Sequence, residues 1–187
     1  MSCRFFATGL LLLLLASCAT ESRLPANLPL PEPSAAALTA SFSQLITASY
    51  DGREQPLLAQ LELSPEKLVV VIMHPSGVRL LSASYDGEKI VTSSLPLPGV
   101  PVTPERVLND IMMAYWPATS WQPLLLPRKQ YLVDTKDQRK LLTREGELIY
   151  QIDYQGKATD PWYRTLTLHN LRYGYQLQIT PLDNAKK

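Results

Sequence analysis

Ser64 and Lys67 are the residues whose spacing comes closest to a nucleophilic site, because they match the Ser-x-x-Lys motif of serine penicillin-binding enzymes. In those enzymes the lysine lies one helical turn from the serine, whereas Ser-Pro-Glu at this position is typical of a turn. No Ser-x-Asn or Lys-Thr-Gly partner follows, and the sequence contains no Gly-x-Ser-x-Gly elbow. We therefore interpret Ser64 as a turn residue and expect no enzymatic activity.

The candidates for metal binding are equally few. His74 and His169 are the only histidines, and their separation does not match the His-x-x-x-His spacing of a zinc helix. Asp51, Asp86 and Asp137 follow strand-like segments and are expected in turns rather than as catalytic carboxylates. The sequence has only 8 glycines and no glycine-rich phosphate loop. We expect neither a metal nor a cofactor.

The net charge argues against binding to nucleic acid. The 187 residues include 18 Lys and Arg and 17 Asp and Glu, which gives a formal charge of +1. Binding to nucleic acid needs a basic surface that neutralises phosphates, and this balance offers none.

The N-terminus has the features of a secretory signal peptide over residues 1–17. Arg4 precedes an apolar run from Phe5 to Leu15, which is shorter than the roughly 17 to 25 residues that a membrane-spanning helix needs. Cleavage after residue 17 would remove Cys3 and make Cys18 the first residue. No second cysteine would then remain for a disulfide.

Leu15-Ala16-Ser17-Cys18 resembles the bacterial lipobox, in which the cysteine thiol carries a diacylglycerol. The resemblance implies lipidation of Cys18, and Ala19 in place of aspartate implies sorting to the periplasmic face of the outer membrane. A secreted protein in which Cys18 is incidental is the alternative. Residues 18–37 are rich in proline and alanine, and they are predicted to form a tether between the lipid and a domain over residues 38–183. Residues 184–187 would be a short tail.

The predicted domain alternates short apolar segments with turn dipeptides, which is typical of antiparallel strands. The pentapeptide Ala-Ser-Tyr-Asp-Gly occurs at 48–52 and again at 83–87, and it predicts two similar hairpins. Leu68–Met73 is apolar on both faces, so this strand is expected to be covered on both sides. About ten strands are predicted, over residues 42–50, 56–63, 67–74, 78–85, 88–95, 129–133, 138–143, 147–155, 164–171 and 173–179.

One helix is predicted between the fifth and sixth strands, from Thr103 to Trp116. Thr103 and Pro104 form an N-cap signal, and Pro117 ends the helix. Val107, Leu108, Ile111, Met112 and Tyr115 form one apolar stripe. Residues 95–102 precede it as a proline-rich apolar strap. A sheet wrapped over this helix would cover both the helix and the apolar strand.

These features together resemble the LolA/LolB group of periplasmic lipoprotein carriers. More closely, they resemble a family of uncharacterised outer-membrane lipoproteins, often found with aryl-polyene gene clusters and considered LolB-like. The resemblance rests on residues 75–81, 85–87, 104–110 with Trp116-Pro117, and 168–175. It implies a mainly β fold, in which a curved antiparallel sheet forms an incomplete barrel with the central helix as a lid over an apolar cavity.

The ligand implied by this resemblance is a lipid, an acyl chain or a polyene, held on the way to the outer membrane. Its partners would be the membrane, a lipoprotein cargo or a periplasmic carrier. The alternative is a protein-interaction module with a filled core and an edge strand that docks a partner. The aromatic clusters around Trp116 and Tyr150 could be core or cavity wall. The residues predicted to line the cavity are Leu61, Leu80, Val107, Leu108, Ile111, Met112, Trp116, Trp121, Tyr150, Ile152, Leu166, Leu168 and Tyr175.

Overall fold

A computed structural model describes residues 29–95 and 103–182 of the chain. The predictions for the signal peptide, for Cys18, for most of the proline-rich strap and for the C-terminal tail fall outside these residues. In the described part, no helix has the length and apolar character needed to cross a membrane.

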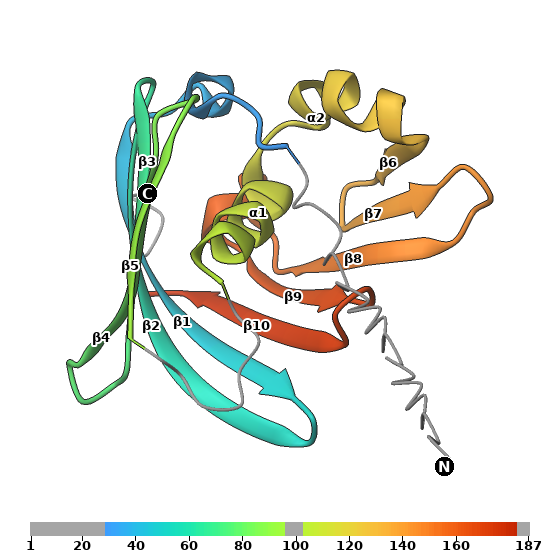
Figure 1. The fold of residues 1–187 in the computed structure, drawn as a ribbon. Coiled ribbons are helices and arrows are strands. Elements are labelled where there is room, and N and C mark those ends of the chain that lie inside the picture. The colour runs from blue at the N-terminus through green and yellow to red at the C-terminus, as the bar shows by residue number, and fades with distance from the viewer. Residues whose placement is uncertain (1–28, 96–102, 183–187) are drawn as a thin grey trace, which may run out of the picture.

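Ten antiparallel strands form one curved, open sheet in the order β5-β4-β3-β2-β1-β10-β9-β8-β7-β6 (Figure 1). The edge strands β5 and β6 do not pair with each other, so the barrel is incomplete, as predicted. The strands are β1 (Ala40–Tyr50), β2 (Arg53–Ser64), β3 (Lys67–Met73), β4 (Arg79–Tyr85), β5 (Ile90–Ser94), β6 (Gln130–Asp134), β7 (Gln138–Thr143), β8 (Leu148–Gln155), β9 (Thr165–Asn170) and β10 (Tyr175–Pro181).

The repeated pentapeptide forms two different turns. In the first copy, Asp51 and Gly52 both have positive φ and close a two-residue hairpin between Tyr50 and Arg53. In the second copy only the glycine has positive φ, and the carboxylate of Asp86 accepts the backbone N–H groups of Glu88 and Lys89. Both copies therefore lie at a hairpin, as predicted, but the two turns differ, because the first joins Tyr50 to Arg53 and the second, longer turn joins Tyr85 to Ile90.

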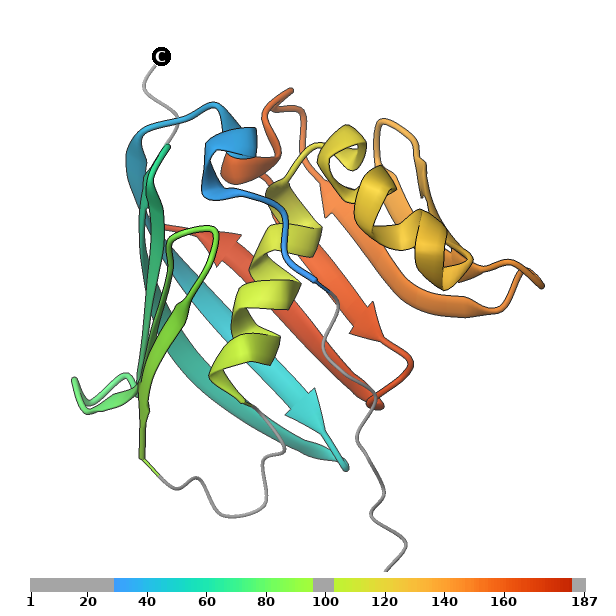
Figure 2. The ribbon, with the colours of Figure 1, turned by 45° about the horizontal axis from the view of Figure 1, so that its top comes forward.

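The predicted helix is present as α1 (Pro104–Tyr115), and it lies inside the curve of the sheet (Figure 2). The Thr103 hydroxyl accepts the backbone N–H of Arg106, which confirms the N-cap. Both arms of the sheet flank the helix, so its polar residues Arg106, Asn109 and Asp110 are buried together with its apolar stripe. The helix is therefore part of the core along most of its length.

A second helix, α2 (Ala118–Leu125), was not predicted. It begins directly after Pro117 and contains Pro123, and a proline within a short segment normally argues against a helix. Its Trp121 is fully buried, and the helix packs against β6. Burial of this tryptophan outweighs the unfavourable proline.

The segment predicted as a tether packs on the domain from its second half onward. Residues 33–36 form a short 3₁₀ helix with Pro33 buried. The Trp116 indole N–H donates to the carbonyl of Glu32 at 3.0 Å, and the Tyr85 hydroxyl donates to that of Leu30 at 3.2 Å. Residues 29–37 thus belong to the folded unit, and a tether would end before them.

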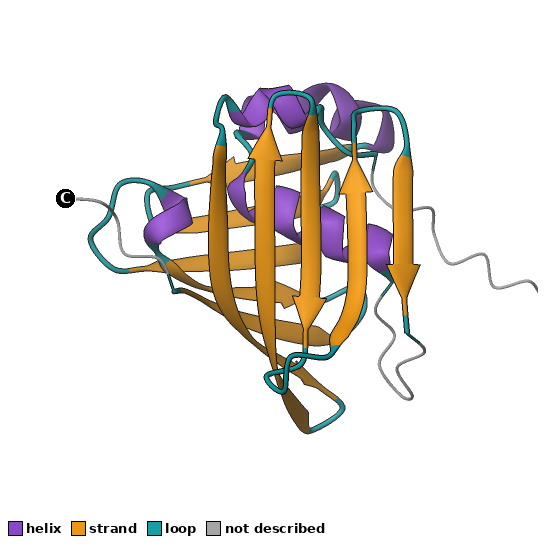
Figure 3. Ribbon diagram, turned by 90° about the vertical axis from the view of Figure 1, so that its left-hand side faces the viewer, coloured by secondary structure: helices purple, strands orange, loops and turns teal. Residues whose placement is uncertain are grey.

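The outer face of β3 is not covered by a second layer, contrary to the prediction. Leu68, Val70 and Ile72 point into the core, while Val69 and Val71 are half-buried on the outer face. Figure 3 shows this outer face of β1–β5 with no helix over it. Cross-strand neighbours such as Gln60 and Ser82, which pair with Val71, shield the valines instead. Within the described residues, the ten strands and the helices α1 and α2 all lie in residues 40–181, so a chain without residues 1–18 keeps each of these elements.

Candidate functional site

A small, mainly apolar cavity lies between α1 and the middle of the sheet. Its volume is about 70 Å³. Two rows of cross-strand neighbours form its floor: Leu177, Ala48 and Gln55 in one row, and Ile179, Ile46 and Leu57 in the next. The remaining walls are built by β3, β4, β10 and α1, through Ile72, Leu80, Leu81, Tyr175, Val107, Asp110 and Ile111.

Four of the residues predicted to line a cavity do so, namely Leu80, Val107, Ile111 and Tyr175. The others are buried in the core and do not line it. This second set consists of Leu61, Leu108, Met112, Trp116, Trp121, Tyr150, Ile152, Leu166 and Leu168.

Most residues of the cavity floor were not predicted from the sequence. Ile46 and Ala48 alternate with outward-facing residues in β1, and Leu177 and Ile179 do the same in β10. This period of two was the available signal. It did not show that the first and last strands pair with each other, which is what brings these side chains together.

One corner of the cavity is polar and is built around Asp110 of α1. The Tyr150 hydroxyl donates to one carboxylate oxygen of Asp110 at 3.0 Å, and the Tyr175 hydroxyl donates to the other. The Asn170 amide donates to the Tyr175 hydroxyl at 2.8 Å. Asp110 and Tyr175 also line the cavity, so a hydrogen-bonded carboxyl group interrupts an otherwise aliphatic wall.

Burial dominates the electrostatics of this corner. Loss of solvation raises the pKa of Asp110 from 3.8 to about 6, although the hydrogen bonds from Tyr175 and Tyr150 and the charge of Arg106 oppose the change. Burial and the nearby Asp110 charge raise the pKa of Tyr150 and of Tyr175 well above the usual value, so both remain protonated donors at neutral pH.

The raised pKa of Asp110 predicts a pH dependence of stability. Because the folded state binds this proton more tightly than the unfolded state does, the contribution of Asp110 to the free energy of unfolding falls as the pH rises from about 4 to about 6. The quantity to compare is the free energy of unfolding of the wild-type domain relative to that of Asp110→Asn. This difference should favour the wild type by about 1 kcal/mol more at pH 5 than at pH 7. Urea unfolding of both proteins at the two pH values measures this. An equal difference in the free energy of unfolding between the two proteins at both pH values would contradict this prediction.

The C-terminal end of α1 is fixed to the sheet by charged and aromatic groups. The buried Arg139 guanidinium of β7 donates to the carbonyls of Met113 and Trp116, each at 2.7 Å, and forms a bidentate pair with Asp134. The Tyr154 hydroxyl donates to the carbonyl of Ala114 at 2.6 Å.

Aromatic stacking reinforces this end of the helix. The Trp162 ring stacks between Phe42 and Tyr115, with ring centroids 4.3 Å and 4.0 Å away. The first two turns of α1 differ, because there Val107, Asp110 and Ile111 face the cavity.

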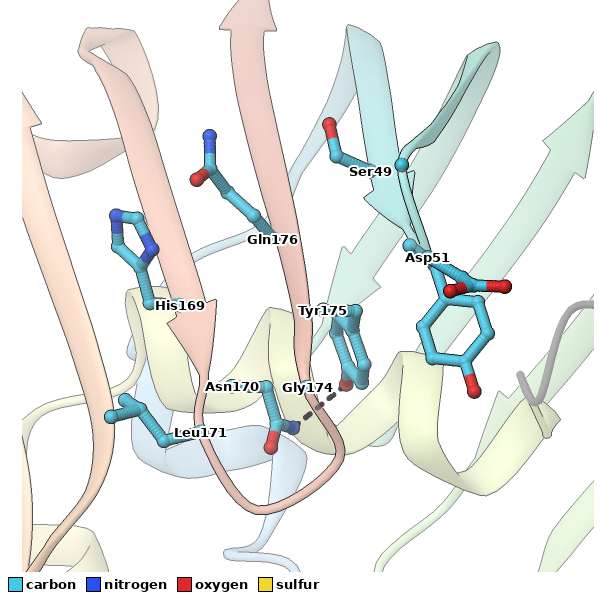
Figure 4. A pocket seen from close by; sticks show the side chains of 10 residues that line it. Ser49, Asp51, His169, Asn170, Leu171, Gly174, Tyr175 and Gln176 are labelled. Atoms are coloured by element: carbon cyan, nitrogen blue, oxygen red, sulfur yellow. Dashed lines mark hydrogen bonds between the residues drawn. The ribbon is translucent and has the colours of Figure 1, made fainter.

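A second depression, of about 370 Å³, lies at the turns that join β1 to β2 and β9 to β10 (Figure 4). It is shallow and open, and Tyr175 lines both this depression and the apolar cavity. His169 and Gln176 extend from one side of the sheet in Figure 4, while Asn170 and Tyr175 are joined by a hydrogen bond near α1. The polar corner therefore lies close to this end of the barrel.

The residues weighed as catalytic do not come together in a site. The Ser64 hydroxyl accepts the backbone N–H of Glu66 within the β2–β3 turn. The ring of His74 bonds to Ser76 in the next turn, whereas His169 is on β9. Within residues 29–95 and 103–182, no group of three or more His, Cys, Asp or Glu side chains could hold a metal ion.

Comparison with known proteins identifies the family. Residues 41–183 match the model of DUF3261, a family of proteins of unknown function, and the chain belongs to it. This confirms the resemblance to an uncharacterised family. A comparison of the sequence with curated proteins gives no match.

Two solved structures are similar to the chain. One is a LolA superfamily protein from Nitrosomonas europaea, with 11% identity, a TM-score of 0.45, and coverage of 80% of this chain and 89% of that one. The other is a putative outer membrane lipoprotein-sorting protein domain from Vibrio parahaemolyticus, with 10% identity, a TM-score of 0.39, and coverage of 76% and 83%.

Proposed function

We propose that this DUF3261 protein binds a single apolar chain, such as an acyl chain or a polyene, between the sheet and the first two turns of α1. The observation that carries the proposal is the enclosed aliphatic cavity, whose floor is formed by inward-facing side chains of β1, β2 and β10. Each methylene removed from water there would contribute about 0.8 kcal/mol to binding. The protein acts as a carrier and not as an enzyme.

Binding requires the cavity to expand. A volume of about 70 Å³ is well below the roughly 300 to 1,000 Å³ of typical ligand sites. Charged and aromatic contacts fix the C-terminal end of α1, and the hydroxyls of Tyr150 and Tyr175 hold Asp110. The first turn, which includes Val107, is therefore the part that would move away from the sheet. Ligand methylenes would then replace Val107 against the floor.

A fluorescence titration tests this proposal. N-phenyl-1-naphthylamine is uncharged, apolar and fluorescent when removed from water. It should bind saturably, with one site per chain, to the domain lacking residues 1–18. Fluorescence that rises linearly without saturation would overturn the carrier proposal.

A protein-interaction module is the second candidate, and the open edges of the sheet favour it. Every residue of the edge strand β5 is exposed, and Val91 is 68% exposed. Tyr131 and Val133 are exposed on the opposite edge strand, β6. An extended partner segment could add to either edge. Failure of the titration would favour this candidate.

We further propose that the carrier is attached through a lipid on Cys18 to the periplasmic face of the outer membrane, where a lipoprotein, a glycolipid or a pigment would be its cargo. The Cys18→Ser variant lacks the thiol, so it should remain as an unprocessed precursor without lipid. Membrane fractionation and mobility on a denaturing gel measure this. A variant that is processed and fractionates like the wild type would contradict the proposed anchor.

A further inference from the structure

We infer that the cavity selects chains whose head group is an uncharged hydrogen-bond donor, and that Asp110 recognises this head group by accepting its hydrogen bond. This inference rests on the proposed carrier function and adds the chemical class of the ligand. Fatty amides carry such a head group, whereas fatty-acid anions do not.

The position of Asp110 in the cavity supports this inference. The walls of the cavity are aliphatic apart from Gln55, Asp110 and Tyr175. Gln55 lies in the outermost row of the floor, near the β1–β2 turn, and is only half-buried. Asp110 lies opposite the floor on α1 and is 5% exposed. A chain that enters between α1 and the floor would therefore meet a carboxyl group away from water.

The hydrogen-bonding capacity of Asp110 is not exhausted by its partners. One carboxylate oxygen accepts the hydroxyl of Tyr150 and the other that of Tyr175, and Asn170 provides a further side-chain hydrogen bond to the carboxylate. A carboxylate has about four acceptor positions, so it can accept a further donor from a ligand. The tyrosine hydroxyls already donate to Asp110 and therefore cannot donate to a ligand acceptor at the same time. The corner is thus an acceptor site.

The charge of Asp110 disfavours an anionic head group. Arg106 is on the same helix, one turn before Asp110, and its guanidinium stacks 3.7 Å from the centre of the Tyr173 ring. Arg106 does not line the cavity, whereas Asp110 does. An anionic head group at this corner would face the negative charge of Asp110 in a medium of low dielectric, and both charges would lose solvation.

The test uses three ten-carbon ligands that compete with N-phenyl-1-naphthylamine at pH 8. Decanamide is neutral and donates hydrogen bonds, methyl decanoate is neutral and only accepts them, and decanoate is an anion. For the wild-type domain lacking residues 1–18, decanamide should compete about tenfold better than methyl decanoate and at least a hundredfold better than decanoate.

Asp110→Asn separates recognition by Asp110 from the general cost of burying a charged ligand. Asparagine keeps the size of the side chain, so the preference for decanamide over decanoate should fall at least tenfold. Asp153→Asn is the matched control, because Asp153 bonds to Gln138 and Gln151 on the outer face of the sheet. It should leave all three competition constants unchanged.

Tyr175→Phe provides an independent variant if Asp110→Asn does not fold. It retains the ring in the cavity wall and removes one donor to Asp110, so the carboxylate should bind a ligand donor more strongly. The preference for decanamide over methyl decanoate should rise at least threefold.

The outcomes distinguish the two proposals. Equal competition by the three ligands in the wild type would overturn this inference, as would a preference that Asp110→Asn or Tyr175→Phe leaves unchanged. In those cases the saturable binding of the probe would still support a carrier. Absence of saturable probe binding would overturn the carrier function and this inference together.

Discussion

Replacing Arg139 with methionine should lower the free energy of unfolding by about 3 to 5 kcal/mol, since one partner of a buried, hydrogen-bonded charge network is lost. Arg139 is 8% exposed, and its guanidinium donates to the carbonyls of Met113 and Trp116 at the end of α1. Methionine has a similar length but no donor, so these carbonyls would lose their charged partner. Urea unfolding followed by tryptophan fluorescence measures the effect.

Asp134→Asn is the control for this variant. Asp134 accepts two hydrogen bonds from Arg139, but its side chain is 36% exposed, so water can replace much of the interaction. We expect a loss of about 1 kcal/mol or less. Similar losses for the two variants would mean that the ion pair, and not the attachment of α1, is what Arg139 contributes.

The role of Arg139 is an example of a contact that local sequence patterns do not predict. The segment Gln138–Thr143 was correctly predicted as a strand, because a turn precedes it and apolar residues follow. Arg139 occupies an inward-facing position of that strand, next to the apolar Leu141 on the same face. A buried arginine is stable here because its guanidinium donates to carbonyl groups at the C-terminal end of α1. That end of the helix is distant from Arg139 in the sequence. No local pattern contains that contact.

The burial of Asp110 and its hydrogen-bond partners could not be predicted from the sequence for the same reason. On the helical wheel it lies beside Asn109 on the polar side, which is typical of a surface helix with one apolar stripe. The sheet curves around α1 and supplies Tyr150 from β8 and Tyr175 from β10 as partners. The fold class and the strand order along the chain follow from local turns and alternation. The polar corner depends on the distant pairing of the strands.

The cavity floor offers the most direct test of binding. Ala48→Phe should reduce the affinity for N-phenyl-1-naphthylamine at least a hundredfold, which corresponds to about 2.7 kcal/mol. Ala48 lies between Leu177 and Gln55 in the outer row of the floor, and its small side chain leaves the space that a ligand would enter. A phenyl ring at this position would occupy that space. Overpacking should cost about 1 to 3 kcal/mol of stability, so the domain should remain folded.

Thr47→Phe is the matched control for this effect. Thr47 is adjacent in β1 but faces the opposite side of the sheet, where it pairs with Gln178 and Pro56. The same ring at this position should leave probe affinity within about twofold, because it does not reach the cavity. Equal losses of affinity in both variants would indicate a general disturbance of the sheet, and unchanged affinity in Ala48→Phe would mean that the probe binds elsewhere. A loss confined to Ala48→Phe would locate the bound chain between the β1 floor and the first two turns of α1, the site that the carrier function requires.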